Sequence, residues 1–264
     1  MKAEKRGTEG TKGRFVGVDV VDLGVDELRD RTRDGRFLDR VFTAGEQTRI
    51  RAAADPDVEL WSLWAAKEAA FKVASKVLGA PPVFRHRAFE VRDPPGTPVA
   101  VVTYGDHAFR VTTQVDDTRV VVHAWSHPAS MILVCDMDLA EAEALLGVGE
   151  PFQDWQARRM SPEERESAHS RASALVRVLA RRDAARHLEL PEDRLTIQCV
   201  PGPTGRRPPF IHLDGVPLAD ADVSLSHHGR RLAWALELPW APVQAESPST
   251  RSSSQAEATV PPRP

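Results

Sequence analysis

The stretch LWAAKEAAFK, residues 63–72, decides the fold because it lies at the centre of an amphipathic segment. On a helical wheel, the apolar residues of 60–78 fall within one narrow stripe, which is typical of a helix that faces a core. The tripeptide DPD at 55–57 predicts the N-terminus of this helix. Gly79 and Pro81 supply a stop, because glycine accepts a left-handed C-cap and proline cannot continue a helix. The stripe consists of Leu60, Trp64, Phe71, Ala74 and Leu78.

Three charged residues interrupt this apolar segment. Lys67 lies in the middle of the stripe, and Glu68 and Lys72 lie one turn apart on its flank. One interpretation is that Lys67 runs its stem along apolar surface while Glu68 and Lys72 form a surface ion pair worth about 0.3–0.5 kcal/mol. The other is that the flank of the helix borders a cleft. The helix segment alone leaves both open.

Composition limits the class of protein. The 264 residues are 41% hydrophobic and carry a net charge of -3, which suits a folded core and argues against a general nucleic-acid binder. Cys135 and Cys199 lie far apart and match no metal or redox spacing, so we expect two core thiols in a reducing compartment. Neither a signal peptide nor a segment able to span a bilayer is recognisable, so the sequence predicts a soluble, cytoplasmic protein.

A repeated plan indicates two modules. Three short segments of the first part of the chain have similar counterparts in the second part, in the same order, which chance rarely produces. We therefore predict an α+β fold of two pseudo-symmetric modules, roughly 15–140 and 141–240, packed as an intramolecular pseudo-dimer. Residues 1–14 are expected to be flexible, and residues 241–264, rich in Pro, Ser and Ala, to form a disordered tail. The first repeat pairs WAAKEAAFKV (64–73) with LARRDAARHL (179–188) and thereby Glu68 with Asp183. The other two repeats pair Glu46 with Glu164 and His127 with His227.

Two segments have the alternation of half-buried strands. In FVGVDVVDL at 15–23, the valines at even positions point to one face, while Gly17 and Asp19 point to the other. Because Gly17 has no side chain, we expect room for a bulky ligand beside the Asp19 carboxylate. The alternative is a solvated aspartate on an edge strand. Apolar residues also alternate on both sides of HHG at 227–229, which predicts a hairpin.

Four segments together resemble the motif set of the 4'-phosphopantetheinyl transferases. They are GVD at 17–19, FTAGE at 42–46, WAAKEAAFK at 64–72 and SLSHHG at 224–229. The resemblance implies transfer of 4'-phosphopantetheine from coenzyme A to a serine of an apo acyl or peptidyl carrier protein, with release of 3',5'-ADP. That is the reaction of a holo-acyl-carrier-protein synthase. The carrier, and with it fatty acid, polyketide or nonribosomal peptide biosynthesis, is left open.

The resemblance also implies a metal site and a catalytic group. Asp19 and Glu68 match the family's metal ligands, and Mg2+ suits them because it is held by one or two carboxylates together with substrate phosphates. Lys72 matches the second lysine of the helix motif and is expected to meet a phosphate of the coenzyme. Glu68 is the candidate general base. Lys67 matches the first lysine of the motif, and the resemblance leaves its role open.

Coenzyme contacts are implied for a second group of residues. Ser226 and His227 match the family residues that contact the coenzyme phosphates. Arg206 or Arg207, with preference for Arg207, is the basic residue of a G-[KR]-P element, and Arg171 resembles an arginine near the 3'-phosphate. The plain alternatives are a polar turn around SLSHHG and a solvated face for the arginines.

Two departures from the larger, surfactin-type enzymes are evident. Val21 stands where those enzymes carry a third metal-binding carboxylate, whereas GVDVVD follows the small synthases. The SLSHHG segment follows the GVD segment instead of preceding it, so the chain resembles a circular permutant, with both halves of one site in one chain. A monomer with no nucleic-acid or membrane partner is expected. The rival hypotheses are an inactive protein that binds coenzyme A or a carrier, and an enzyme that hydrolyses another pyrophosphate.

Overall fold

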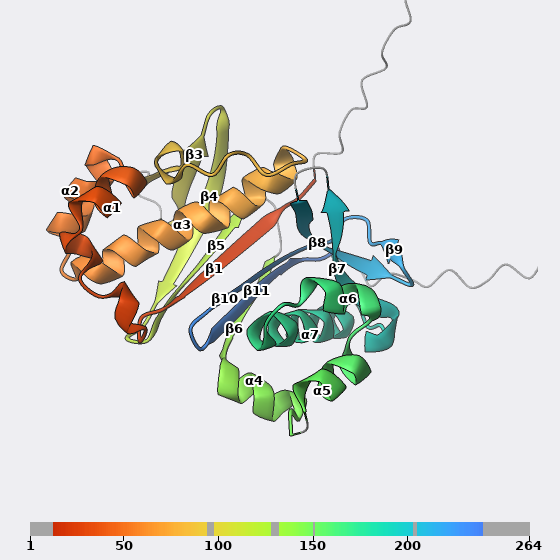
Figure 1. The fold of residues 1–264 in the computed structure, drawn as a ribbon. Coiled ribbons are helices and arrows are strands. Elements are labelled where there is room, and N and C mark those ends of the chain that lie inside the picture. The colour runs from red at the N-terminus through yellow and green to blue at the C-terminus, as the bar shows by residue number, and fades with distance from the viewer. Residues whose placement is uncertain (1–12, 94–97, 128–131, 150, 203–204, 240–264) are drawn as a thin grey trace, which may run out of the picture.

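The computed structural model describes residues 13–93, 98–127, 132–149, 151–202 and 205–239, and side chains except those of residues 200–207. Within this part of the chain the strands form one five-stranded and two three-stranded antiparallel sheets. A long helix covers the five-stranded sheet, and another covers one of the three-stranded sheets (Figure 1). None of the described helices is long and apolar enough to cross a bilayer. Most of the expected flexible N-terminus and all of the expected tail lie outside the described residues.

The first part of the chain forms a five-stranded sheet of order β1-β5-β4-β3-β2 beneath helix α3 (Figure 1). A core of apolar side chains, including Leu60, Phe89 and Phe109, fills the space between them. The strands are β1 (Val16–Asp22), β2 (Glu90–Arg92), β3 (Ala100–Tyr104), β4 (His107–Val115) and β5 (Arg119–Trp125). The helices are α1 (Gly35–Val41), α2 (Ala44–Ala52) and α3 (Pro56–Val77), with short 3-10 turns at Asp26–Leu28, Arg31–Arg33 and His86–Ala88.

Helix α3 begins and ends where the sequence predicts. The Asp55 side chain accepts hydrogen bonds from the backbone N–H groups of Asp57 and Val58, so it caps the N-terminus, and Pro56 occupies the first turn. Gly79 takes a left-handed conformation with φ of 71° just beyond the C-terminus. The predicted start and end of the helix are therefore confirmed.

The predicted apolar stripe of this helix is only partly right. Leu60 and Ala74 are buried, and Trp64 and Phe71 are partly buried, but Leu78 is 44% exposed.

The second part has its own sheet, of order β10-β11-β6, and helix α7 packs on it. The predicted hairpin around HHG is present as β10 and β11. Strand β6 pairs with β11 although it lies before residue 140, where the sequence analysis places the module boundary. The strands are β6 (Ile132–Asp138), β10 (Asp222–His228) and β11 (Arg231–Glu237), and the helices are α4 (Leu139–Leu146), α5 (Phe152–Arg159), α6 (Pro162–Ser167) and α7 (Arg171–His187), with a 3-10 turn at Glu192–Arg194.

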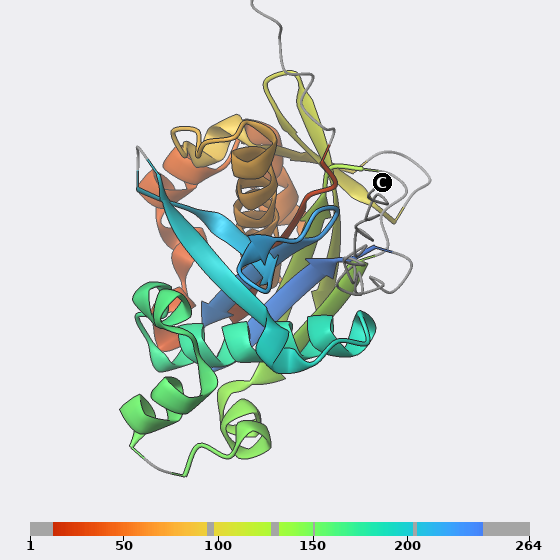
Figure 2. The same ribbon diagram turned by 90° about the vertical axis from the view of Figure 1, so that its right-hand side faces the viewer.

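The third sheet lies where the two parts meet. It consists of β7 (Leu195–Gly202), β8 (Gly205–Leu213) and β9 (Val216–Pro217), and β8 touches both α3 and β10. Figure 2 shows its strands, teal to light blue, crossing in front of the larger sheets.

A row of hydrogen bonds joins the free edge of β1 to β10. Every second N–H group of β1 donates to a side chain of β10, so the edge of the first sheet is covered without forming a continuous sheet. We call this row the β1–β10 ladder. Its bonds run from Val16 N to Asp222 Oδ2 at 2.7 Å, from Val18 N to Ser224 Oγ at 3.0 Å, from Val20 N to Ser226 Oγ at 3.4 Å and from Asp22 N to His228 Nδ1 at 3.1 Å.

A buried ion pair fixes one end of the ladder. Lys76 Nζ lies 2.7 Å from Asp222 Oδ2 and donates to the carbonyl oxygens of Val16 and Val223 at 2.8 Å each. Burial lowers the pKa of Lys76 and raises the pKa of Asp222, while the attraction between them opposes both shifts. Helix α3 is thereby tied to β10 across the junction.

The hairpin turn fixes the other end. Gly229 has a φ of 53°, and a Cβ there would lie 2.5 Å from Asp22 Oδ2. That same carboxylate oxygen accepts from Arg230 N at 2.8 Å. Only glycine permits this close approach, so the last glycine of SLSHHG has a structural role at this turn.

A buried carboxylate organises each part in the same way. In the first part, Glu46 forms a capping box with Thr43. Its two carboxylate oxygens lie 2.8 Å from Lys67 Nζ, and Oε1 accepts from Val91 N at 2.9 Å. Lys67 also donates to the carbonyl oxygens of His86 and Phe89. Because its side chain is 0% exposed, Lys67 neither runs along the surface nor faces a ligand.

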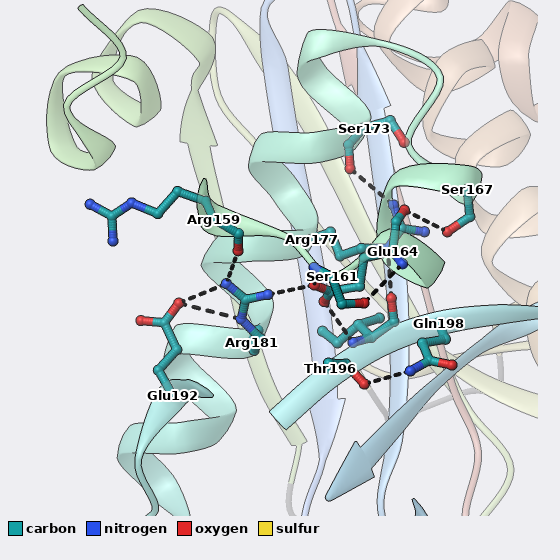
Figure 3. A network of polar contacts seen from close by, with 11 residues as sticks. Arg159, Ser161, Glu164, Ser167, Ser173, Arg177, Arg181, Glu192, Thr196 and Gln198 are labelled. Atoms are coloured by element: carbon teal, nitrogen blue, oxygen red, sulfur yellow. Dashed lines mark hydrogen bonds and ion pairs between the residues drawn. The ribbon is translucent and has the colours of Figure 1, made fainter. Parts of the chain in front are cut away.

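Glu164 has the matching position in the second part (Figure 3). It forms a capping box with Ser161, accepts from Ile197 N at 2.8 Å and lies 2.6 Å from Arg181 Nη1. Arg181 also contacts Glu192 at 3.1 Å, so its guanidinium lies between two carboxylates. Glu46 and Glu164, which the sequence repeat pairs, therefore make the same kinds of contact: a capping box, a strand N–H group and a buried cation.

The other two sequence repeats are aligned differently in the structure. Pairing Glu68 with Asp183 would place Lys67 opposite Arg182. In the structure it is Arg181 that pairs with the buried glutamate as Lys67 does, so the two helices align one residue away from the predicted pairing. The pairing of His127 with His227 is wrong. His227 lies in the first strand of a hairpin, whereas His127 follows the last strand of the first sheet.

Replacing Lys67 by Met should destabilise the protein by about 3–5 kcal/mol, because the Glu46 carboxylate would stay buried without a cation. Urea unfolding measures the change. Arg186→Met is the control, since Arg186 pairs with Asp183 from a side chain that is 68% exposed, and should cost less than about 1 kcal/mol. Equal stabilities of the two variants would contradict this account of the buried pair.

Candidate functional site

Asp19 lies at the centre of the candidate site, where β1, α3 and β10 meet. Its Oδ1 accepts from Lys72 Nζ at 2.9 Å and from Ser226 Oγ at 2.8 Å. Lys72 also donates to the Val18 carbonyl oxygen at 2.6 Å. The exposed fractions of the Asp19 and Lys72 side chains are 13% and 28%, so the pair is partly shielded and still reachable. The structure therefore brings together residues from three of the four motifs.

The expected open space beside Gly17 is not there. A Cβ at Gly17 would overlap the carbonyl oxygen of Ala69 in α3. Glycine is needed because the helix backbone packs directly on β1, which corrects the expectation that this position leaves room for a ligand. The close packing places the flank of α3 against Asp19.

Glu68 points to a different partner from the one that the helix pattern suggests. Its Oε1 lies 3.3 Å from His86 Nε2, and Lys72 turns to Asp19, so the surface pair between Glu68 and Lys72 is not formed. The His86 ring lies 4.3 Å from the Trp64 ring and 4.1 Å from the Phe84 ring. Among the described contacts, no hydrogen bond or ion pair joins Glu68 to Asp19. Sequence analysis missed His86, because it lies 18 residues away in an irregular segment.

His227 lies next to Ser226 in β10, on the face of the strand that carries Val223 and Leu225, and its side chain is exposed at the end of that face. Partial burial lowers its pKa, and the positive charges of Lys72 and Arg177, together with His228, lower it further, while Asp19 acts in the opposite direction. The imidazole is therefore expected to be neutral at neutral pH.

The expected arginines are less well connected to this centre. Arg171 heads α7, pairs with Glu143 at 2.9 Å and stacks over Phe152, and it has no described contact with Asp19 or His227. The backbones of Arg206 and Arg207 belong to β8, and their side chains lie outside the described residues.

A pocket of about 230 Å³ opens beside Lys72 at the junction of the two parts. Five of its nine lining residues are apolar, and they come from α3, the segment that follows it, β8 and β10. It is lined by Phe71, Lys72, Ser75, Lys76, Pro81, Pro208, Pro209, Ser224 and Leu225.

Asp19 and Glu68 offer the donor chemistry that Mg2+ takes together with substrate phosphates. Asp19 and Glu68 supply carboxylate oxygens from two elements in contact, and Mg2+ commonly takes one or two carboxylates plus waters and phosphates. The described residues contain no cluster of three or more His, Cys, Asp or Glu able to hold a metal. Val21, where the resemblance implied a missing third ligand, is buried in the core. Two carboxylates without a third are compatible with an ion completed by phosphates and water.

The first part of the chain matches a known family. Residues 15–126, from β1 to the end of β5, match the family model described as ACPS, 4'-phosphopantetheinyl transferase superfamily. The match covers less than half of the 264 residues and supports this superfamily, with a transferase activity in general. A search of curated proteins found no match.

The His227 pKa should be below 6.5, because desolvation and the Lys72 ammonium both disfavour the imidazolium. A titration of the histidine ring signals by NMR, with His227→Gln for assignment, measures it. Lys72→Met should move the His227 pKa upward, since one of the opposing charges is removed. A value above 6.5 in the unaltered protein would contradict this description of the site.

Proposed function

We propose that this chain transfers the 4'-phosphopantetheine arm of coenzyme A to a serine of an apo carrier protein and releases 3',5'-ADP. The observation that carries the proposal is that Lys72 of α3 and Ser226 of β10 both reach Asp19 of β1. These three residues come from three separate motifs of the transferase family. The family match over residues 15–126 supports the same class of reaction.

The proposed reaction is a displacement at phosphorus. The serine oxygen of the carrier forms a bond to the pantetheine-side phosphorus, the bond to the oxygen of 3',5'-ADP breaks, and the serine proton passes to a base. Glu68 is the proposed base, directly or through a water, because its carboxylate is partly exposed beside Lys72 and can accept a proton. The contact with His86 holds this carboxylate on the exposed side of α3.

Asp19 and Glu68 are the proposed ligands of Mg2+, which when bound neutralises charge on the pyrophosphate and on the leaving group. Lys72 is proposed to leave Asp19 for a phosphate oxygen when coenzyme binds. His227, Arg171 and the basic residues Arg206 and Arg207 are the proposed contacts of the coenzyme phosphates.

The proposed architecture is an intramolecular pseudo-dimer of two transferase modules. The shared contacts of Glu46 and Glu164 support it. We place the module boundary in front of β6, because β6 pairs with β11. The order of the motifs supports a circular permutant of a surfactin-type enzyme. Since one chain supplies both sides of the site, we propose that it acts as a monomer.

Intact-mass spectrometry tests the activity. Apo acyl and peptidyl carrier proteins are incubated with the protein, coenzyme A and Mg2+, and each modified carrier should gain the mass of one phosphopantetheine arm. Asp19→Ala should abolish the gain, because a proposed metal ligand is removed, and Glu68→Gln should slow turnover by about 100-fold or more if Glu68 is the base.

Two outcomes would redirect the assignment. Coenzyme A bound without mass gain on any carrier would favour an inactive binding protein, consistent with Val21 in place of a third carboxylate. Release of 3',5'-ADP without a carrier would favour a hydrolase. Full turnover by Glu68→Gln would remove Glu68 as the base and leave the transferase in place.

Lys72→Met should have opposite effects on the two ligands. Removal of the ammonium from Asp19 should tighten Mn2+ binding in the absence of coenzyme by about 1–2 kcal/mol, because a competing cation is lost. Coenzyme A binding should weaken by about 1.5–3 kcal/mol, because a charged donor to phosphate is lost. Isothermal titration calorimetry measures both. Weaker Mn2+ binding by the variant would contradict the proposed movement of Lys72.

A further inference from the structure

Ser226 has two hydrogen bonds that together fix what its hydroxyl can do. It lies in β10 with 8% of its surface exposed. The oxygen accepts from Val20 N at 3.4 Å, and Oγ lies 2.8 Å from Asp19 Oδ1. A carboxylate has no proton to give, so the single hydroxyl proton of Ser226 is donated to Asp19.

We infer that Ser226 is a positioning residue of Asp19, and that it acts on the metal-binding carboxylate and not on the coenzyme. A phosphate oxygen needs a donor, and the only proton of this hydroxyl is committed to Asp19. A role in coenzyme contact, which the family resemblance implies, would need that bond to break. The inference rests on the proposed function, since it takes Asp19 as a metal ligand.

The two bonds give β10 control over the orientation of Asp19. The bond from Val20 N fixes the hydroxyl relative to the β1 backbone, and the hydroxyl then holds one oxygen of the neighbouring side chain. Carboxylates that bind metals are commonly held by such hydrogen bonds, and loss of one costs about 10–100-fold in metal affinity. In this way the second part of the chain shapes a metal site whose ligands belong to the first part.

Ser224 provides a matched control. It lies two residues earlier in β10, is 2% exposed and accepts from Val18 N at 3.0 Å. None of its described hydrogen bonds reaches Asp19. Ser224→Ala and Ser226→Ala therefore each remove one acceptor from the β1–β10 ladder, and only Ser226→Ala removes the donor to Asp19.

The test is a calorimetric titration of Mn2+ into the full chain without coenzyme. Ser226→Ala should bind Mn2+ about tenfold more weakly than the unaltered protein, Ser224→Ala within about twofold, and Ser226→Thr close to the unaltered value because it keeps the hydroxyl. The two alanine variants should lose similar amounts of thermal stability. If Ser226→Ala does not fold, Ser226→Cys takes its place, since a thiol is a weaker donor.

A second titration separates the two possible roles. Coenzyme A is titrated in the presence of EDTA. If Ser226 positions the metal-binding carboxylate, Ser226→Ala should bind coenzyme A with unchanged affinity. If Ser226 contacts a phosphate, the affinity of Ser226→Ala for coenzyme A should fall. Equal Mn2+ affinities of the two alanine variants, or a loss confined to coenzyme A, would overturn the inference.

The failure of the proposed function gives a different result. An Asp19→Asn variant is measured in parallel. If the unaltered protein and Asp19→Asn bind Mn2+ equally, without coenzyme and again with 3',5'-ADP present, Asp19 is not a ligand, and the proposed metal site fails together with this inference. If Asp19→Asn loses Mn2+ while Ser226→Ala does not, only the inference fails.

Discussion

Strand β1 has β5 on one side only, so the N–H groups of its other edge need acceptors inside a buried junction. Strand β10 supplies them from side chains at every second position, with His228 at the last one. A slip by one residue would bring Val223 and Leu225 to these N–H groups, and neither has an acceptor. This requirement fixes the register of the two parts of the chain to a single arrangement.

The geometry of the site follows from that register. With Ser226 opposite Val20, its hydroxyl comes within reach of Asp19, the neighbouring residue. Lys76 and Lys72 stand one turn apart on α3 and meet the same junction at two points, Lys76 at Asp222 and Lys72 at Asp19. Lys76 is buried, and Lys72 is partly exposed and is the lysine proposed to move to a phosphate.

The sequence predicts the elements of this site better than the contacts between them. Helix α3 and the hairpin of β10 and β11 follow from periodicity and from local caps, which short stretches of sequence specify. The β1–β10 ladder joins residues 206 positions apart, and a serine that accepts from a distant N–H group leaves no periodic pattern. The same holds for Glu46 and Lys67, since a charge within an apolar stripe does not reveal its partner. The close packing at Gly17 is equally hidden, because Ala69, whose carbonyl oxygen fills that space, lies 52 positions away in sequence (69 − 17).

The two parts share several contacts and differ at the one place where chemistry is proposed. Strand β6 runs beside β11 as β1 runs beside β5, and Cys135 of β6 lies next to Asp183 of α7. Burial and the Asp183 carboxylate raise the pKa of Cys135 to about 11, so the thiol stays protonated at neutral pH and is a poor ligand for a hard cation. Asp183 also accepts from Trp234 Nε1 at 2.9 Å and pairs with Arg186. Asp183 is engaged in structure, and so are both carboxylates of β6, because Asp136 pairs with Arg119 at 2.7 Å and Asp138 caps α4. The described residues of the second part therefore offer no free carboxylate pair like Asp19 and Glu68. Its proposed contribution to the site is the row of side chains on β10.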